Sequence, residues 1–258
     1  MFSWFTRRRF DQWILPSLVL VMWQILSYLE IIPNFLLPSP LRILLGFKDL
    51  VIIGMPPGHL LHVHALYSLY RVAWGFAVAV LLAIPLGLLM GWSGRLRYLI
   101  SPLFELVRPI PPLAWIPIAI LWFGIGLKSA VFIIFLGAFF PILINTVSGV
   151  TSIHPRYVEV IRTLNANGKD IFLKVLLPGS IPSIFVGMRI GVGIGWMSLV
   201  AAEFTGVREG YGLGYMIMTA RDIQRPDEIL AGMLVIGIIG LFINSGFKIC
   251  ESKIIRWK

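Results

Sequence analysis

The chain has 258 residues, of which 58% are hydrophobic and only 13% are charged. Soluble domains carry about 25% charged residues, so this composition excludes an ordinary water-soluble enzyme and indicates a membrane protein. The net charge of +10 would suit a nucleic-acid partner only if the basic residues lined a wettable face, and in so apolar a chain we expect no nucleic acid to bind.

Runs without Asp, Glu, Lys or Arg predict where the chain crosses the membrane, because a spanning helix needs about 20 largely apolar residues. Five runs meet this requirement, and a sixth is interrupted only by Arg189. The six expected spans are residues 12–29, 72–94, 109–127, 129–155, 180–202 and 229–247. Residues 50–70 are also uncharged, but glycines, prolines and three histidines interrupt them. The expected fold is an all-α membrane protein with six transmembrane helices.

The distribution of Lys and Arg predicts the orientation of these spans. With the N-terminus inside, the inner segments carry about twice as many basic residues as the outer ones, which is the bias of cytoplasmic loops. Arg7, Arg8 and Arg9 precede the first span, and no small-residue cleavage site follows before Glu30, so we expect this span to be retained. We therefore expect a multi-pass protein of the cell (inner) membrane with both termini in the cytoplasm, and attraction of its net charge to anionic lipid.

After the first span, Pro38-Ser39-Pro40 precedes an amphipathic stretch at residues 41–50, which we expect at the membrane surface. Residues 1–65 are thus expected to form an N-terminal transmembrane helix with an outer amphipathic segment, and residues 66–258 the core transmembrane domain.

Three histidines follow this segment, and the second span begins after them. His59, His62 and His64 do not share one helix face, and no carboxylate or thiol lies near them in the sequence, so we expect no metal.

The second span is rich in Gly and Ala, which predicts close approach to neighbouring helices. Arg71, at its outer end, is expected to be an interfacial anchor.

The third expected span contains Pro109, Pro111 and Pro112, and each proline removes an amide donor and clashes with the preceding turn. We therefore expect a broken helix, which membranes tolerate only where it is buried in protein or lines a cavity. Arg108 directly precedes the break, where freed backbone amides would help to hold an anion. This makes Arg108 the main candidate for the substrate path; the alternative is an ion pair with Glu105 on the same helix face.

Four other residues of the spans are candidates, each with a plain structural alternative. Trp115 and Trp196 line the path or, alternatively, pack in the core or at the interface. Glu203, at the outer end of the fifth span, lines a gate, meets an external partner, or is simply solvated. Arg189 is expected to snorkel inward or to form a salt bridge rather than contact an anion.

The most informative inner segment is residues 151–178, which is too long for a simple turn. Val158, Ile161 and Leu164 recur at helical spacing, with Glu159 and Arg162 beside them. We expect Asn165 and Gly168 to end this short helix, and a second short helix over 170–177 to be stopped by Pro178. Two short helices presented to the cytoplasm indicate a docking element.

This segment resembles the EAA loop of ABC-importer permeases, whose pattern is Glu-Ala-Ala, three residues, Gly, nine residues, Ile-x-Leu-Pro. Glu159 occupies the Glu position, Val175 the Ile position, and Leu177-Pro178 the Leu-Pro position with the spacing intact. Val160 and Ile161 replace the two Ala residues, and Asn165 replaces the Gly. Because Asn also adopts left-handed turns, the same geometry with bulkier packing is expected.

The resemblance extends from about residue 66 to the end. The stretches at 68–93, 108–126, 139–150 and 187–204 resemble the aliphatic-sulfonate and taurine permeases, which form a wider group with nitrate, bicarbonate and thiamine-precursor permeases. The resemblance implies a type I importer with two permease copies, two cytoplasmic ATPase subunits and an extracytoplasmic binding protein. The chain has no phosphate-binding G-x-x-x-x-G-K-[ST] motif, so we expect ATP and Mg on the ATPase subunits and no cofactor on this chain.

The expected function is import of a small anion, with an alkanesulfonate or taurine first and nitrate, bicarbonate or a thiamine precursor second. Residues 151–178 are here named the coupling element, after the role that the resemblance implies. The residues in it expected to contact the ATPase are Val158, Glu159, Ile161, Arg162, Leu164, Asn165, Gly168 and Pro178. A channel or secondary carrier acting without ATP is the alternative from another class, although it predicts acidic or histidine relays that the spans largely lack. We expect no enzyme, because no clustered nucleophile, base or metal site is present in the sequence.

Overall fold

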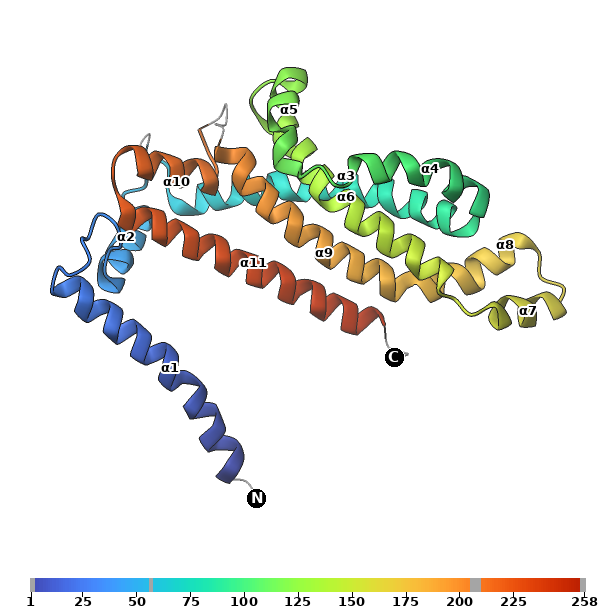
Figure 1. The fold of residues 1–258 in the computed structure, drawn as a ribbon, viewed down its shortest axis with the longest axis horizontal. Helices are drawn as coiled ribbons and strands as arrows, with labels where there is room; N and C mark the ends of the chain where they lie inside the picture. The colour runs from blue at the N-terminus through green and yellow to red at the C-terminus, as the bar shows by residue number, and fades with distance from the viewer. Residues whose placement is uncertain (1–2, 56–57, 205–209, 256–258) are drawn as a thin grey trace. The chain divides into compact units, whose positions relative to one another are not determined.

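The computed structural model describes residues 3–55, 58–204 and 210–255, with side chains described from residue 14. All regular elements in these residues are helices (Figure 1), as the all-α prediction requires. Six of the basic residues counted for the predicted orientation lie outside the described part. They are Arg7, Arg8 and Arg9, of which only the backbone is described, and Arg208, Arg256 and Lys258. The α-helices, in chain order, are α1 (Ser3–Tyr28), α2 (Pro40–Ile52), α3 (Leu61–Trp92), α4 (Gly94–Val107), α5 (Ile116–Phe123), α6 (Leu127–Thr151), α7 (Pro155–Thr163), α8 (Gly168–Ile171), α9 (Leu177–Phe204), α10 (Leu213–Asp222) and α11 (Pro226–Ile254).

Four helical runs in the described residues are long and apolar enough to cross a membrane: α3, α6, the run Gly168–Phe204, and α11. The bent pair Gly94–Val107 and Pro112–Phe123 would make a fifth. The first expected span coincides with α1, in which Ile14–Tyr28 is a shorter apolar helix. Six spans therefore remain a prediction.

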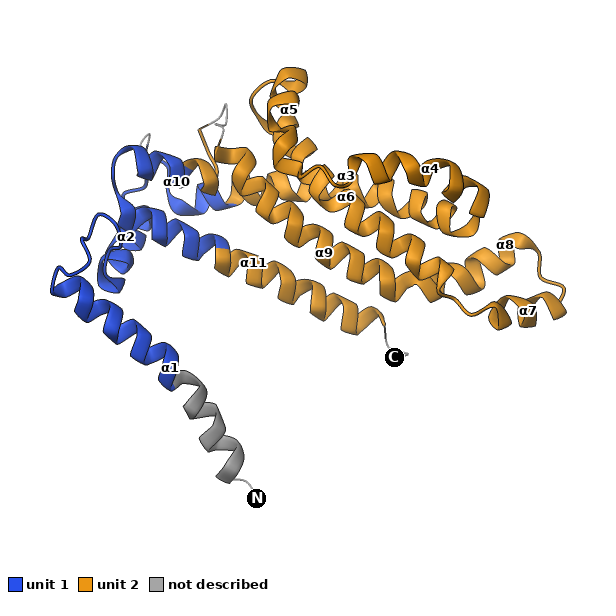
Figure 2. Cartoon of the chain, in the orientation of Figure 1, with its two compact units in different colours: residues 1–65, 216–236 blue, residues 66–215, 237–258 orange. Residues whose placement is uncertain are grey.

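The chain divides into two compact units, coloured separately in Figure 2. The first unit comprises residues 1–65 and 216–236, and the second comprises residues 66–215 and 237–258. Helices α3, α10 and α11 continue from one unit into the other.

In the first unit, α2 is the expected amphipathic helix. The Ser39 side chain caps it by accepting a hydrogen bond from the Arg42 N–H at 3.3 Å, and Ile43 and Leu50 are buried on one side. Arg225 joins α2 to the start of α11 through Asp49, Asp227 and Glu228 at 2.8–3.0 Å. Hydrogen bonds to Asp227 and then Asp49 raise the pKa of Arg225, so its guanidinium stays charged.

In the second unit, α6 is the central helix, and α3 and α9 pack against it. A Cβ on Gly87 of α3 would lie only 2.7 Å from the Cβ of Thr146, and one on Gly191 of α9 would lie 2.9 Å from the Ala138 carbonyl oxygen. Glycines at these positions let the helix backbones approach closely. The structure confirms the close approach predicted for the second span.

The expected break in the third span is confirmed, but its place in the span differs from the prediction. Residues 109–127 do not form one crossing helix. A 3₁₀ turn, Pro112–Trp115, and the eight-residue α5 follow α4 at a bend of 80°. Because Pro109, Pro111 and Pro112 lack amide donors, α4 ends before them and a new helix starts after them. Only α4 and α5 together reach the length of a span.

Two predicted helix ends are also wrong. Helix α3 begins at Leu61 rather than residue 72, because Arg71, whose charge ended the apolar run in the sequence, is paired inside the protein. Pro178 does not stop a helix: α8, a π-helical turn at Phe172–Leu176 and α9 form one continuous run. Pro178 is the second residue of α9, where its missing N–H breaks few helical hydrogen bonds because the wider π turn precedes it.

Candidate functional site

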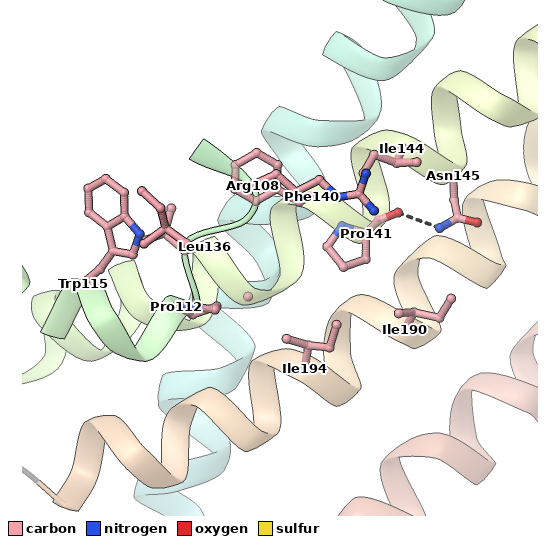
Figure 3. Close-up of a pocket in the computed structure, with 12 residues that line it drawn as sticks. Arg108, Pro112, Trp115, Leu136, Phe140, Pro141, Ile144, Asn145, Ile190 and Ile194 are labelled. Atoms are coloured by element: carbon pink, nitrogen blue, oxygen red, sulfur yellow. Dashed lines mark hydrogen bonds between the residues drawn. The ribbon is translucent and has the colours of Figure 1, made fainter. Parts of the chain in front are cut away.

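Arg108 lies at the C-terminal cap of α4, where its backbone N–H donates to the Phe104 carbonyl at 2.8 Å. It borders a cavity of about 380 Å³ in the second unit (Figure 3). The broken segment contributes Arg108, Ile110, Pro112 and Trp115, α6 contributes Leu136, Gly137, Phe140, Pro141, Ile144 and Asn145, and α9 contributes Ile190 and Ile194. The predicted broken helix therefore lines a cavity.

The chemistry of this cavity is one cation and one amide in apolar surroundings. Arg108 is the only ionisable residue among those that line it, and Asn145 is the only amide side chain. The Asn145 Nδ2 donates to the Pro141 carbonyl at 2.8 Å, which fixes the orientation of the amide (Figure 3). A guanidinium favours a bound anion, because hydrogen bonds between charged groups are stronger than those between neutral groups.

A second cavity, of about 330 Å³, shares Arg108, Phe140 and Ile144 with the first. Glu105, Ser148 and Thr151 also line it, so Arg108 lies between the two cavities. In the described residues no ion pair within 4.0 Å joins Arg108 to Glu105. The expected alternative, in which Glu105 neutralises Arg108, is therefore not seen.

Three polar side chains of α6 extend from these cavities to the C-terminal end of the helix. Asn145, Ser148 and Thr151 are spaced three residues apart, so they lie near one face of α6 and cover about 9 Å of its length. Thr151 is the last residue of α6 and the first residue of the coupling element. No sequence motif singled out this series, since single Ser, Thr and Asn residues are common in membrane helices.

The two tryptophans have different surroundings. Trp115 lines the Arg108 cavity and stands edge-on to Phe132, with ring centroids 6.5 Å apart. Trp196 is only 6% exposed and packs beside Gly240 of α11. It lines neither of the two cavities, and its packing matches the plain alternative expected from the sequence.

Arg71 and Glu203 form a buried ion pair, which the sequence did not predict. The Arg71 Nη1 lies 2.7 Å from the Glu203 Oε1, and the side chains are 1% and 0% exposed. Arg71 is therefore not an interfacial anchor, and Glu203 is not solvated. The sequence alone offered no clear signal, because 132 residues separate the partners.

Arg189 forms the salt bridge that was one of its two expected states. Its Nη1 lies 3.2 Å from the Glu251 Oε2 near the end of α11, and both side chains are partly exposed. Arg189 does not line the cavity of Arg108.

The coupling element consists of α7 and the start of the α8–α9 run. His154 caps α7 by accepting from the Arg156 N–H at 3.2 Å, and Asn165 follows α7 with φ +58°, the left-handed turn expected there. The sequence predicted that Gly168 would help to end this helix, but Gly168 is instead the first residue of α8. Asn167 and Asp170 form a reciprocal capping box at this start.

The predicted contact residues of this element divide into two sets. Val158 and Ile161 are half-buried and pack inward on a cluster formed by Leu88, Val150, Ile171, Leu176 and Ile184. Glu159, Arg162 and Leu164 are exposed, with Leu164 at 76%. Tyr157 and Val160, which the sequence analysis did not select as contacts, are exposed as well.

An open groove of about 990 Å³ lies between α7 and the α8–α9 run. Tyr157, Val160 and Leu164 line it from α7, and Lys174 and Pro178 line it from the other side. An apolar groove beside exposed charged residues can accept a protein partner.

The family model described as binding-protein-dependent transport system inner membrane component matches residues 83–250. An ABC transporter permease protein of Methanocaldococcus jannaschii is 42% identical over 254 residues, covering 95% of this chain and 90% of that protein. The aliphatic sulfonates transport permease protein SsuC of Bacillus subtilis is 36% identical over 245 residues, covering 95% of this chain and 86% of that protein. The taurine transport system permease protein TauC of Escherichia coli is 35% identical over 244 residues, covering 93% of this chain and 87% of that protein.

The nitrate import permease protein NrtB of Synechocystis sp. is 36% identical and covers 93% of this chain and 86% of that protein. The bicarbonate transport system permease protein CmpB of Synechococcus elongatus is also 36% identical and covers 97% of this chain and 92% of that protein. Among solved structures, a chain of the MetNI methionine ABC transporter in an inward-facing conformation aligns with a TM-score of 0.65. It covers 74% of this chain and 94% of that chain at 19% identity. This likeness shows a shared fold.

Proposed function

Because this chain belongs to the family of inner membrane components of binding-protein-dependent transport systems, and is an ABC importer permease of the sulfonate, taurine, nitrate and bicarbonate group, we propose that it carries a small anion through the Arg108 cavity. The observation that carries the proposal is the position of Arg108. Its guanidinium borders a cavity at a broken helix and has no neutralising carboxylate within 4.0 Å among the described residues.

The cavity supports an alkanesulfonate or taurine as the substrate. Arg108 and Asn145 would hold the oxyanion, and Ile190, Ile194 and Trp115 would contact a short hydrocarbon part. Nitrate and bicarbonate have an oxyanion but no hydrocarbon part to use this apolar wall. Nitrate, bicarbonate or a thiamine precursor are therefore the alternative substrates of the same group.

We place the ATPase contact on the coupling element. Exposed Tyr157, Val160 and Leu164 would enter the partner surface, with Glu159 and Arg162 fixing the register. Val158 and Ile161 hold α7 against the chain's own core, so movement of α7 would be transmitted to α6 and α9. ATP and Mg belong to the partner subunits in this proposal.

The proposed assembly contains two copies of this chain, two ATPase subunits and an extracytoplasmic binding protein. Both termini lie in the cytoplasm, on the same side as the coupling element. Closure of the ATPase subunits on ATP would pull on α7 and rock the spans between inward-open and outward-open states. The binding protein would deliver the anion to the outward-open state.

The substrate path is tested by Arg108→Ala in the complex reconstituted with its ATPase and binding protein. Taurine uptake should fall at least about tenfold, because a charge-assisted contact contributes about 1.5–3 kcal/mol. Arg108→Lys should retain part of the uptake, and Arg97→Ala, an exposed α4 arginine outside both cavities, should leave it unchanged. Normal uptake by Arg108→Ala would remove Arg108 from the path.

The coupling contact is tested by Glu159→Lys and Leu164→Asp, which change exposed side chains and should leave the permease folded. Both should abolish co-purification of the ATPase or coupled uptake. Lys128→Glu, a charge reversal at the opposite end of α6, serves as the control. Uptake that persists with a nucleotide-dead ATPase would instead support the channel or secondary carrier.

A further inference from the structure

Three side chains and a short backbone segment in the second unit form a closed polar cluster, here named the Arg71 latch. It consists of Ser68 and Arg71 on α3, Glu203 at the end of α9, and the backbone of residues 211–214. Arg71 Nη1 donates to the Glu203 Oε1 and to the Tyr211 carbonyl, each at 2.7 Å. The latch thus ties α3, α9 and the entry to α10 together.

The other hydrogen bonds of the latch satisfy both Ser68 and Glu203. The Ser68 hydroxyl donates to the Glu203 carboxylate at 2.9–3.0 Å and accepts from the Leu213 N–H at 2.9 Å. The Gly214 N–H donates to the Glu203 Oε2 at 2.9 Å. A buried charge is tolerated when it is paired and hydrogen-bonded in this way.

The backbone of this segment is shaped to fit the carboxylate. Gly212 has φ +147°, and a Cβ at this position would lie 2.5 Å from the Glu203 Cδ. Only glycine allows this approach without displacing Glu203. The Tyr67 and Tyr211 rings stack beside the cluster with centroids 4.6 Å apart, and the Arg71 Cζ lies 5.9 Å from the Tyr67 ring centroid.

The residue before Glu203 packs near the wall of the Arg108 cavity. Ala202, which precedes Glu203, packs in a cluster with Ala119 of α5, Ala130 and Ile133 of α6, and partly buried Trp115. Trp115 lines the Arg108 cavity. The latch therefore fixes the end of α9 that supports the helix beyond the break.

We propose that the Arg71 latch keeps the turn of α3 that carries Ser68 and Arg71, the end of α9 and residues 211–214 together as one rigid body throughout the transport cycle. Arg71 and Glu203 are then positioning residues for transport. Opening the latch would separate two charges in a low-dielectric environment, which is strongly unfavourable. The inference rests on the proposed transport function, but its test is independent of which anion is carried.

A covalent bridge across the latch tests this directly. Tyr67→Cys and Tyr211→Cys are combined with Cys250→Ser in the complex reconstituted in vesicles with its ATPase and binding protein. A short bis-methanethiosulfonate reagent should join the two cysteines, because the native rings are in contact. Binding-protein-stimulated ATP hydrolysis and taurine uptake should stay within about twofold of the unbridged complex. Each single-cysteine variant, treated with the reagent, is the matched control.

Loss of ATP hydrolysis on bridging would overturn the proposal, because it would mean that the latch must open. Failure of the bridge to form would overturn it as well, because Tyr67 and Tyr211 would then not remain adjacent. Normal uptake by Arg108→Ala would contradict the proposed substrate path but would not alter either of these readings. The two proposals therefore fail separately.

The positioning role is tested by Glu203→Gln, which keeps the shape of the side chain and removes its charge. In assembled complexes the maximal rate of ATP-driven uptake should fall about tenfold or more, since small misplacements of a site can cost that much. The KM for taurine should change little, because the latch does not line the cavity. Glu203→Asp should recover part of the rate. A normal rate in Glu203→Gln, or failure of assembly in Glu203→Asp and Glu203→Gln alike, would reject the positioning role.

Discussion

Arg71 and Arg108 both lie at the ends of predicted spans, but their surroundings are opposite. Arg71 is 1% exposed and joins a carboxylate and a backbone carbonyl, whereas Arg108 borders two cavities and meets no carboxylate within 4.0 Å in the described residues. The same residue type therefore holds helices together at one place and, in the proposed function, is available to bind an anion at the other. The partners of an intramembrane charge, rather than its presence, indicate its role.

The largest effect on stability is expected at Arg71. Arg71→Ala should destabilise the complex by about 3–5 kcal/mol, because it leaves Glu203 buried without its countercharge. Thermal unfolding of the detergent-solubilised complex measures the loss. Arg71→Met combined with Glu203→Leu should recover much of the stability, while an unchanged melting temperature in Arg71→Ala would contradict the buried pair.

Arg108→Ala should show the reverse pattern. Its free energy of unfolding should stay within about 0.5 kcal/mol of the unaltered protein, as expected of an exposed side chain without structural partners. The same melting experiment measures this, with Arg97→Ala as the control. A loss comparable with that of Arg71→Ala would show that Arg108 supports the fold, and the contrast between the two arginines would disappear.

Asn145→Ala tests the second polar side chain of the Arg108 cavity. Removal of a single amide should raise the KM for taurine about 3–10-fold, since a neutral hydrogen bond contributes about 0.5–1.5 kcal/mol. The effect should be smaller than that of Arg108→Ala. An unchanged KM would show that the substrate does not contact the Asn145 side of the cavity.

Arg189→Ala should have only a small effect on stability and on uptake. Its pair with Glu251 is partly exposed, and such pairs contribute about 0–1 kcal/mol. Thermal unfolding should therefore change little, and uptake should be nearly normal. A large loss of uptake would place Arg189 on the path of the anion instead.

The elements of this protein differ in how far the sequence predicts them. The long apolar runs predicted that α6 and α11 would form, because a membrane span depends on local composition, although α11 extends beyond the predicted residues 229–247 at both ends. The start of α3 was misplaced, because Arg71 looks like the end of a span until its partner is known. Pro178 was misread for a similar reason, since its position within a helix depends on the preceding π turn.

The candidate site was predicted in part. Arg108 was selected because it precedes a run of prolines, and its place beside a cavity follows from the helix break. The series Asn145, Ser148 and Thr151 was not selected, since only the cavity gives these common residues a shared meaning. In the coupling element, helical spacing identified Val158, Ile161 and Leu164 together, but the spacing did not show that the first two face the chain's own core.

The membrane class, the broken third span, the left-handed turn at Asn165 and the family resemblance can be predicted from the amino-acid sequence, because each depends on composition or on residues close together in the chain. The contact of Arg71 with Glu203, and the lack of a carboxylate near Arg108 in the described residues, are seen only in the folded chain. Electrostatic partners are set by distances in space, and helix packing brings together residues that are far apart in the chain.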